Sequence, residues 1–247
     1  MNKRIKFIMA YTTIPKSSEH FRIKTFTGNG TNDTAITWDE SSNMKPDFLW
    51  FKNRSEAQSH ALFDVIRGAD KRLISNESGA EGTEATNLDS FDTNGFTVDN
   101  ELIVNGSGDN MVTWGWKAGN SQGSSNTAGS INTTYTSVNT TAGFSISSYT
   151  GNGSAGATIG HGLGVKPAMI IVKKLNGAYN WGIYHKNIGA TKLLAFTDAI
   201  PDTSTSYWND VEPTSSVFSV GNGALTNGSG STMIAYCFSE IKGYSKF

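Results

Sequence analysis

The residues with the clearest potential for chemistry are a histidine, an aspartate and an arginine in the first half of the chain. His60, Asp64 and Arg67 are residue types that serve acid–base catalysis or bind phosphate. His60, Leu62 and Asp64 alternate along an expected strand, so their side chains should share one face. Such an alternation is more typical of a strand surface than of an active site, and we expect no catalysis there.

An acidic run is the second candidate. Its carboxylates are, in chain order, Glu77, Glu81, Glu84, Asp89 and Asp92. Two carboxylates at a suitable separation can hydrolyse a glycosidic bond, and several oxygens together can bind calcium. The run lacks the glycine-anchored, alternating spacing of a dedicated calcium loop. We therefore interpret it as a solvated loop.

The other polar candidates also favour structural roles. Gly28-Asn29-Gly30 and Gly151-Asn152-Gly153 precede no predicted helix and have no lysine placed for a phosphate, so we predict turns. His161 lies between two glycines and is interpreted as a loop histidine. Cys237 is the single cysteine, which excludes an intramolecular disulfide, and its apolar surroundings predict a small buried hydrophobe. We predict no catalytic residue, no metal site and no cofactor.

Aromatic side chains beside amides and carboxylates are suited to hold a sugar, because an aromatic ring is rigid and amphipathic. The candidates for contact with a ligand are Tyr179, Trp181, Tyr207 and Trp208, which lie near Asn180, Asn209 and Asp210. Tyr207 and Trp208 fall in a segment rich in Ser, Thr and Asp, so we expect at least one of the two rings to be exposed. The alternative is that each ring covers an edge of its own core.

Composition excludes several classes of partner. The chain has 247 residues, of which 17% are charged, and a formal net charge of -1. Because no broad positive field is present, we expect neither nucleic acid nor a membrane as a partner. The apolar run 7–11 is too short for a signal peptide, and no stretch reaches the roughly 20 apolar residues of a membrane span. We expect a protein made in the cytoplasm, with Met1 or Met9 as its first residue.

The chain contains an internal repeat at a spacing of about 122 residues. The matching segments are Thr27-Gly28-Asn29-Gly30 with Thr150-Gly151-Asn152-Gly153, Lys45-Pro46-Asp47-Phe48 with Lys166-Pro167-Ala168-Met169, Gly68-Ala69-Asp70-Lys71 with Gly189-Ala190-Thr191-Lys192, Phe96-Thr97-Val98 with Phe218-Ser219-Val220, and Asn105-Gly106-Ser107-Gly108 with Asn227-Gly228-Ser229-Gly230. Residues kept in both copies should serve the shared fold. The candidate acid–base set is not kept, because the equivalent positions are Trp181, His185 and Ile188.

Each copy shows short strands between turns rich in glycine and asparagine. The alternating segment 21–26 predicts a strand with one wet face, and the apolar runs 48–51 and 169–172 predict strands covered on both faces. Asn94-Gly95 has the chemistry of a tight hairpin turn. In 111–116 and 233–238 one face carries large side chains and the other small ones, as expected of a central strand in a two-sheet sandwich.

These patterns predict an all-β protein made of two tandem, jelly-roll-like β-sandwich modules. The expected organisation is an extended N-terminal arm at 1–20, module one at 21–117, a connector at 118–143 and module two at 144–247. The connector is rich in Gly, Ser, Thr and Asn, but its part 131–138 is β-prone. We expect an ordered surface crossing, part of which pairs as a strand.

The sequence resembles a module found in structural proteins of marine bacteriophages. The resemblance rests on Lys45-Pro46-Asp47-Phe48-Leu49-Trp50-Phe51-Lys52, Phe91-Asp92-Thr93-Asn94-Gly95-Phe96, Gly160-His161-Gly162-Leu163-Gly164-Val165-Lys166-Pro167 and the opening Met9-Ala10-Tyr11-Thr12-Thr13-Ile14-Pro15. It extends over nearly the whole chain from Tyr11. Modules of this kind occur singly or in tandem in virion structural or tail-fibre proteins. The resemblance brings no catalytic motif and implies a component of the capsid or tail.

We therefore expect a non-enzymatic virion protein on the particle surface, most simply a capsid decoration or cement protein or a short head fibre. The N-terminal arm would be its anchor, with Lys3, Arg4, Lys6, Tyr11 and Pro15 as anchor residues. Its expected partners are other virion proteins and further copies of itself, with a trimer as one arrangement. The alternative is a tail-fibre-type carbohydrate-binding module that recognises host surface glycans.

Overall fold

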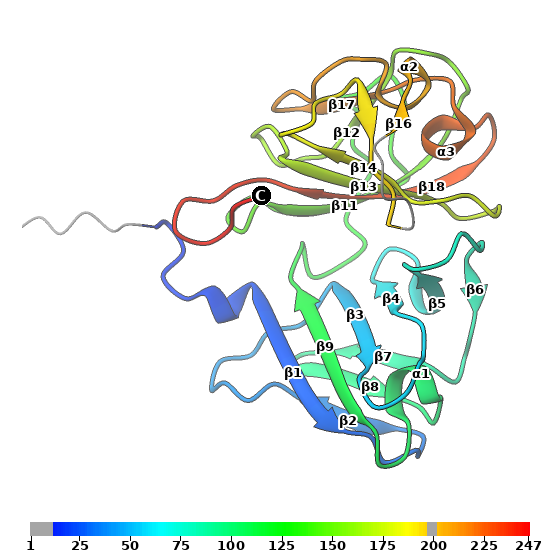
Figure 1. Ribbon diagram of the computed structural model, residues 1–247. Helices are drawn as coiled ribbons and strands as arrows, with labels where there is room; N and C mark the ends of the chain where they lie inside the picture. The colour runs from blue at the N-terminus through cyan, green and yellow to red at the C-terminus, as the bar shows by residue number, and fades with distance from the viewer. Residues whose placement is uncertain (1–11, 197–201) are drawn as a thin grey trace, which may run out of the picture.

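The computed structural model describes residues 12–196 and 202–247, and it confirms the predicted all-β class (Figure 1). The elements of the first half are a 3-10 helix (Ser17–Glu19), β1 (Phe21–Thr27), β2 (Thr34–Thr37), β3 (Phe48–Asn53), β4 (Ala61–Asp64), β5 (Gly68–Ile74), β6 (Gly82–Thr83), β7 (Leu88–Asp92), β8 (Gly95–Val98), α1 (Leu102–Asn105) and β9 (Asn110–Trp116). Those of the second half are β10 (Tyr135–Asn139), β11 (Phe144–Thr150), β12 (Ala157–Gly160), β13 (Met169–Lys174), β14 (Gly182–His185), β15 (Lys192–Leu193), β16 (Asp202–Thr203), α2 (Thr205–Trp208), β17 (Val217–Val220), α3 (Ala224–Asn227) and β18 (Thr232–Phe238).

The first half is a sandwich of two antiparallel sheets. A six-stranded sheet in the order β1-β9-β3-β4-β5-β6 is backed by a three-stranded sheet in the order β2-β8-β7. Leu49, Phe51 and Phe63 of the large sheet pack against Phe96 and Val98 of the small one, because alternate residues of each strand point into the space between the sheets. The predicted hairpin turn lies between β7 and β8.

The second half repeats these pairings. Its five-stranded sheet runs β10-β11-β18-β13-β14, in which β11, β18, β13 and β14 pair as β1, β9, β3 and β4 do, and the pair β12-β17 repeats the pair β2-β8. One edge differs between the halves. In the second half β10 pairs with β11, whereas no strand of the described residues pairs with the outer side of β1.

The repeated glycine and asparagine motifs meet each other in space. A side chain on Gly28 would overlap the carbonyl oxygen of Gly106, so only glycine permits this approach of two backbone segments. The buried Asn105 accepts a hydrogen bond from the backbone N–H of Asn29 (3.0 Å) and donates one to the carbonyl of Thr31 (3.0 Å). The equivalent contacts of the second half join Gly151 to Gly228 and Asn227 to Asn152 and Ser154. The repeated motifs are therefore structural joints between the first turn and the short helix of each half.

The central strands β9 and β18 turn their small residues toward their own sandwich. A Cβ atom on Gly115 would lie 2.7 Å from the Trp38 ring, which fills the space in the first core. The large side chains of these strands point the other way, to the outer face of each large sheet. Trp116 of β9 and Phe238 of β18 approach with ring centroids 6.4 Å apart.

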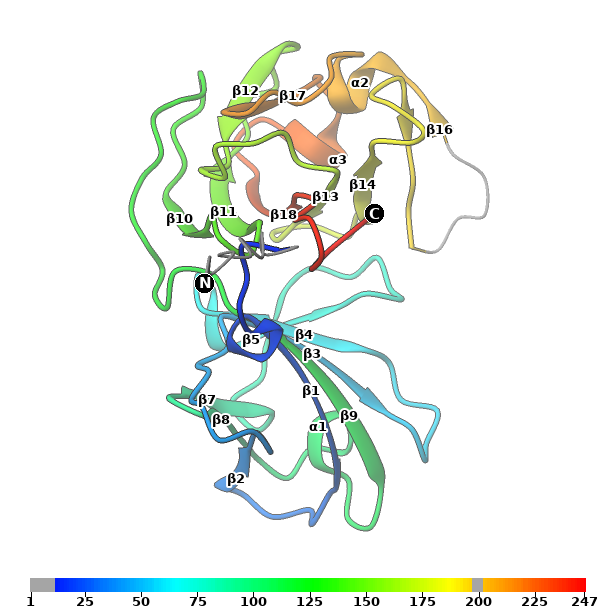
Figure 2. The ribbon, with the colours of Figure 1, turned by 90° about the vertical axis from the view of Figure 1, so that its left-hand side faces the viewer.

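The outer faces of the two large sheets share a third apolar core, which we call the seam. Its buried members are Phe48, Leu62, Ile66, Leu73 and Ala118, and Phe144, Ile146, Ile171, Trp181, Ile183, Ile234, Tyr236 and Phe238. The strands of the first sheet run toward the second sheet, so that one end of the first sheet meets the face of the second (Figures 1 and 2). The two sandwiches are therefore packed against each other.

The part of the predicted arm that the structure describes packs on the first sandwich, which corrects the expectation of an extended anchor at 12–20. Ile14 is only 3% exposed, and the Ser18 carbonyl accepts a hydrogen bond from Arg22 Nε (2.5 Å). Residues 1–11, which include the predicted anchor residues Lys3, Arg4, Lys6 and Tyr11, lie outside the described residues. Pro15 is exposed.

The connector is ordered and contains a strand, as predicted. Its β10 forms the edge of the second large sheet, so this sheet starts at Tyr135 rather than at Phe144. Gln122 Nε2 donates a hydrogen bond to the carbonyl of Ile66 (2.9 Å), which fixes the crossing to the first half. Within residues 12–196 and 202–247 no helix has the length and apolar character needed to cross a membrane.

Candidate functional site: the seam and its aromatic pocket

A buried polar cluster lies at the seam. Arg67 and Asp64 form an ion pair with Nε and Oδ2 2.5 Å apart, and the Tyr236 hydroxyl donates to the same Oδ2 atom (2.7 Å). Arg67 Nη1 also approaches Glu81 Oε2 (3.2 Å), and Arg67 Nη2 donates to the carbonyl of Leu62 (3.1 Å). Tyr236 comes from the second half and the others from the first. The cluster therefore joins the two halves through charge-assisted hydrogen bonds.

The electrostatics of this cluster favour a fixed, charged pair. Burial alone would lower the pKa of Arg67, but the interactions with Asp64, Tyr236 and Glu81 together outweigh burial and raise the pKa above its ordinary value. Burial raises the pKa of the Tyr236 hydroxyl well above its ordinary value. Arg67 thus stays cationic and Tyr236 stays a neutral donor.

Further hydrogen bonds cross the seam from side chains of the second half to backbone carbonyls of the first. Lys173 Nζ donates to the carbonyl of Ser78 (3.0 Å), and Trp181 Nε1 donates to the carbonyl of Ile74 (3.0 Å). Lys173 is fully buried, and burial lowers its pKa to about 8. Because these bonds end on backbone carbonyls, they hold the hairpin that follows β5 against the second sheet.

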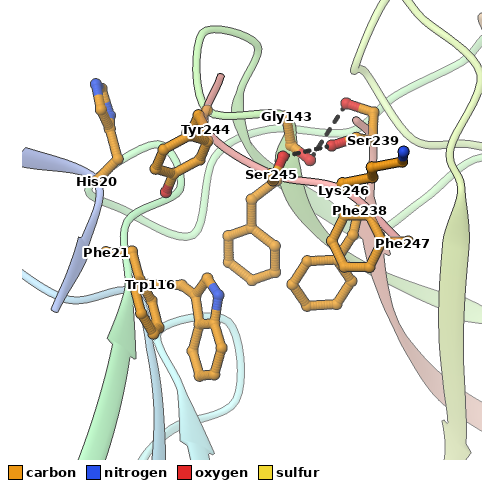
Figure 3. Close-up of a pocket in the computed structure, with 12 residues that line it drawn as sticks. His20, Phe21, Trp116, Gly143, Phe238, Ser239, Tyr244, Ser245, Lys246 and Phe247 are labelled. Atoms are coloured by element: carbon orange, nitrogen blue, oxygen red, sulfur yellow. Dashed lines mark hydrogen bonds between the residues drawn. The ribbon is translucent and has the colours of Figure 1, made fainter. Parts of the chain in front are cut away.

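One end of the seam opens into an aromatic pocket with a volume of about 290 Å³ (Figure 3). The rings around it are Phe21, Trp116, Phe144, Phe238, Tyr244 and Phe247. Phe21 and Trp116 come from the first sheet, with ring centroids 4.9 Å apart, and Phe247 packs on Phe238 at 5.7 Å. The pocket therefore presents ring faces from both halves to one space, close in volume to the smaller ligand sites of proteins.

The rim of the pocket carries a few polar groups. His20 Nδ1 lies 3.1 Å from Asn139 Nδ2, and burial followed by the charge of Lys117 lowers the pKa of this histidine. Ser245 Oγ donates to the carbonyl of Ser239 (3.1 Å). Rings inside and scattered hydrogen-bonding groups outside suit a flat, amphipathic ligand such as a sugar ring.

The structure separates the predicted acid–base set. Asp64 and Arg67 meet, as described, but His60 turns to Trp50, whose Nε1 donates to His60 Nδ1 (2.9 Å). Burial lowers the pKa of His60. With the aspartate held by Arg67 and the histidine by Trp50, these residues form two structural contacts.

The acidic run is also dispersed among separate partners. Glu77 accepts from Ser59 Oγ (2.7 Å), Glu84 pairs with Arg72 (2.9 Å), and Asp92 accepts from Thr97 Oγ1 (2.9 Å). Glu81 joins the Arg67 cluster, and Asp89 is exposed. The interpretation as a solvated loop therefore needs correction, because most of these carboxylates brace the first sandwich. Among the described residues no group of His, Cys, Asp or Glu is arranged to hold a metal ion.

The predicted ligand-contacting aromatics divide into two pairs. Trp181 and Trp208 are buried, which corrects their assignment as ligand contacts, because one lies in the seam and the other in the second core. Tyr179 is exposed and its ring lies under the Lys174 ammonium (4.3 Å). Tyr207 is half-buried and its hydroxyl donates to Asp202 Oδ2 (2.6 Å). The four rings do not form one surface.

Two of the remaining candidates are buried. His161 accepts at Nδ1 from the backbone N–H of Leu163 (3.2 Å), and burial lowers its pKa to about 4. Cys237 is a buried free thiol, as predicted, and burial raises its pKa to about 12. A neutral imidazole and a protonated thiol at neutral pH serve packing.

Sequence reasoning missed the pocket and one buried carboxylate. Asp47 Oδ2 accepts from the backbone N–H groups of Ala118 (2.6 Å) and Asn120 (2.9 Å), which fixes the start of the connector. The sequence did offer one signal for Asp47, because the equivalent residue of the second copy is Ala168. A position that differs between the two copies can make a contact that connects them. The pocket had no local signal, because its rings come from four distant segments.

Comparison with known proteins gives a family and no named relative. The model of one protein family, described as a domain of unknown function and designated DUF7483, matches residues 16–247. No curated protein and no solved structure matches the chain. The match covers both sandwiches and the connector. The chain belongs to the DUF7483 family.

Proposed function

We propose that this protein is a non-enzymatic structural component of a bacteriophage particle, carried on its surface as a capsid decoration or cement protein or as a short head fibre. The resemblance described above supports this assignment. The structure explains the resembling segments as parts of the scaffold. The segment 45–52 leads into and forms β3, and 91–96 forms the hairpin between β7 and β8.

The seam is the observation that carries the proposal. A buried apolar core and a buried ion-pair cluster join the two sandwiches, so the chain offers two similar folds in one fixed relation. A rigid block with two related surfaces suits contact with the regularly repeated subunits of a capsid. The protein would attach to the particle through its N-terminal arm. Because residues 12–20 pack on the first sandwich, the proposed anchor is limited to residues 1–11.

Co-sedimentation tests this function. The full chain and a chain starting at Thr12 are each mixed with purified phage heads that lack the protein, and the pelleted fraction is measured. The cut at Thr12 keeps the buried Ile14 and the Ser18 carbonyl that binds Arg22, so the truncated chain should fold. We expect the full chain to pellet and the truncated chain to remain in solution. If neither chain pellets, attachment to the head is contradicted.

The aromatic pocket favours carbohydrate recognition as a second candidate function. Its rings and polar rim have the chemistry that holds a sugar, and multiple copies on a particle would make a weak site useful. A glycan array separates the two sites that this protein offers. Loss of binding in Phe247→Ala, with Tyr179→Ala unchanged, would place the sugar in the pocket, whereas the reverse would place it at the loop around Tyr179. An array without any signal would contradict this candidate.

A further inference from the structure

The first large sheet leaves part of its outer face uncovered. Ile23, Trp114 and Trp50 are paired directly across β1, β9 and β3, so their side chains form one row on that face. Ile23 is 53% exposed, and both tryptophans are half-buried. A row that contains a half-exposed isoleucine and two tryptophans is an apolar surface of the kind that proteins use for contact.

The equivalent row of the second half is fully covered. It consists of Ile146, Tyr236 and Ile171, paired across β11, β18 and β13 in the same way, and all three are buried in the seam. The first half covers it, through Phe48 in particular, whose ring lies 4.6 Å from that of Tyr236. The chain thus already contains one example in which this face of the fold packs against another module of the same fold.

The uncovered row is continuous with the seam. The next row of the first sheet, Phe21, Trp116 and Phe48, packs against the second half, and the Trp50 and Phe48 rings are 6.4 Å apart. The row also reaches Phe196 of the second half, which is 39% exposed and lies 5.7 Å from Trp50 and 5.6 Å from the seam residue Trp181. The apolar surface therefore extends outward from an interface that the protein already uses.

Two polar side chains in or beside the row are already engaged. Trp50 Nε1 donates to His60, and the Lys52 ammonium in the following row donates to the carbonyls of Asn53 (2.6 Å) and Gln58 (2.8 Å). Arg22 and Lys24 of β1 point to the opposite face, where they pair with Glu40 and Asp39. A sugar would find few free donors or acceptors here, so the row suits an apolar protein surface.

We infer that the row of Ile23, Trp114 and Trp50 is an interface through which two copies of this chain associate. An isologous contact brings the row of one copy onto the same row of the other. No unpaired charge lies in the row, so the two identical surfaces meet without repulsion. The inference rests on the proposed assembly role, and it names the surface through which the protein would contact itself.

The test is the oligomeric state of the full chain. Sedimentation equilibrium is run up to about 0.1 mM, so that a dimer with a dissociation constant in the micromolar range is detected. Ile23→Lys adds a charge to the row, and Leu102→Lys is the matched control, because Leu102 is equally exposed (53%) but lies in α1. We expect a wild-type dimer, the same dimer for Leu102→Lys, and a dissociation constant at least about tenfold higher for Ile23→Lys. The thermal midpoint of each monomer confirms that the variants fold.

Other results would overturn the inference. A wild-type chain that is monomeric throughout this range, or an Ile23→Lys variant that dimerises like the wild type, contradicts self-association through the row. If the wild type is monomeric but Ile23→Lys loses co-sedimentation with phage heads, the row binds a different protein of the particle. Self-association is then wrong while the proposed function stands. The reverse result, a dimer that never pellets with heads, overturns the function and leaves the interface in place.

Discussion

At the scale of single residues, buried polar groups determine how the two halves are joined. Asp64, Arg67 and Tyr236 satisfy one another across the seam, and Asp47 holds the start of the connector. None of these contacts is repeated in the other half, where the positions of Asp47 and Asp64 are taken by Ala168 and His185. Residues that differ between the copies thus carry the contacts between them.

Replacement of Arg67 should show how much the seam cluster contributes to the stability of the folded chain. Arg67→Met leaves the buried Asp64 carboxylate without its cation, which should lower the free energy of unfolding by about 3–5 kcal/mol. The control Arg72→Met breaks the partly exposed pair with Glu84 and should cost at most about 1 kcal/mol. Urea denaturation measures both variants. Equal losses for the two variants would contradict a special role for the seam cluster.

Two buried groups should give stability opposite dependences on pH. Burial raises the pKa of Asp47 from 3.8 to about 6, so the folded chain binds this proton more tightly and the group adds stability as pH falls from 7 to 4. Burial lowers the pKa of His161 from 6.5 to about 4, so this group removes stability over the same range. The backbone N–H groups of Asn120 and Ala118, followed by the charges of Lys45 and Lys117, moderate the rise in the pKa of Asp47.

Variants separate these two effects. The unfolding free energy of the wild type minus that of Asp47→Asn should increase by about 1–3 kcal/mol as the pH is lowered from 7 to 4. The unfolding free energy of the wild type minus that of His161→Gln should decrease over the same change of pH. Urea denaturation at several pH values supplies both differences. Differences that stay constant with pH would show that neither group titrates abnormally.

At the scale of elements, the joint between the first turn and the short helix explains why the same motifs appear twice. Each joint needs a glycine at which two backbone segments meet and a buried asparagine that bridges them. Both motifs lie in the loops that follow β1 and β11, and the turns themselves come after them at 32–33 and 155–156. Their mutual contact was not visible in the sequence, because the two partners are far apart along the chain.

Glycine replacement tests the joint. Gly28→Ala places a methyl group against the Gly106 carbonyl, so we expect a loss of about 1–3 kcal/mol and a matching loss for Gly151→Ala. Gly79→Ala is the control, because no atom lies within 4 Å of its added carbon. Thermal unfolding compares the three variants. If Gly28→Ala and Gly79→Ala have the same midpoint, the close approach is not a constraint.

The sequence predicted a strand correctly wherever the pattern of a single segment was enough to identify it. The covered runs at 48–51 and 169–172 became β3 and β13, and the two-faced segments became the central strands β9 and β18. The direction of their large faces could not be predicted, because alternation defines two faces without saying what covers each. Arg22 shows the same limit, since this charged side chain is buried while the apolar Ile23 of the same strand is exposed.

At the scale of the whole molecule, the seam makes the two sandwiches one structural unit. Phe48 contacts Tyr236 and Phe144, so the first sheet completes its packing only in the presence of the second. We expect a single unfolding transition in calorimetry, with equal calorimetric and van't Hoff enthalpies. Two separate transitions would show that the sandwiches unfold independently.

The proposed role on a phage particle is tested most directly by co-sedimentation run to saturation. Increasing amounts of the full chain are added to purified heads that lack it, and the bound amount is measured per head. A structural protein of the particle surface should reach a plateau at a fixed number of copies, because capsid subunits offer a fixed number of equivalent sites. Binding that rises without a plateau, or no binding at any concentration, would contradict the proposed function.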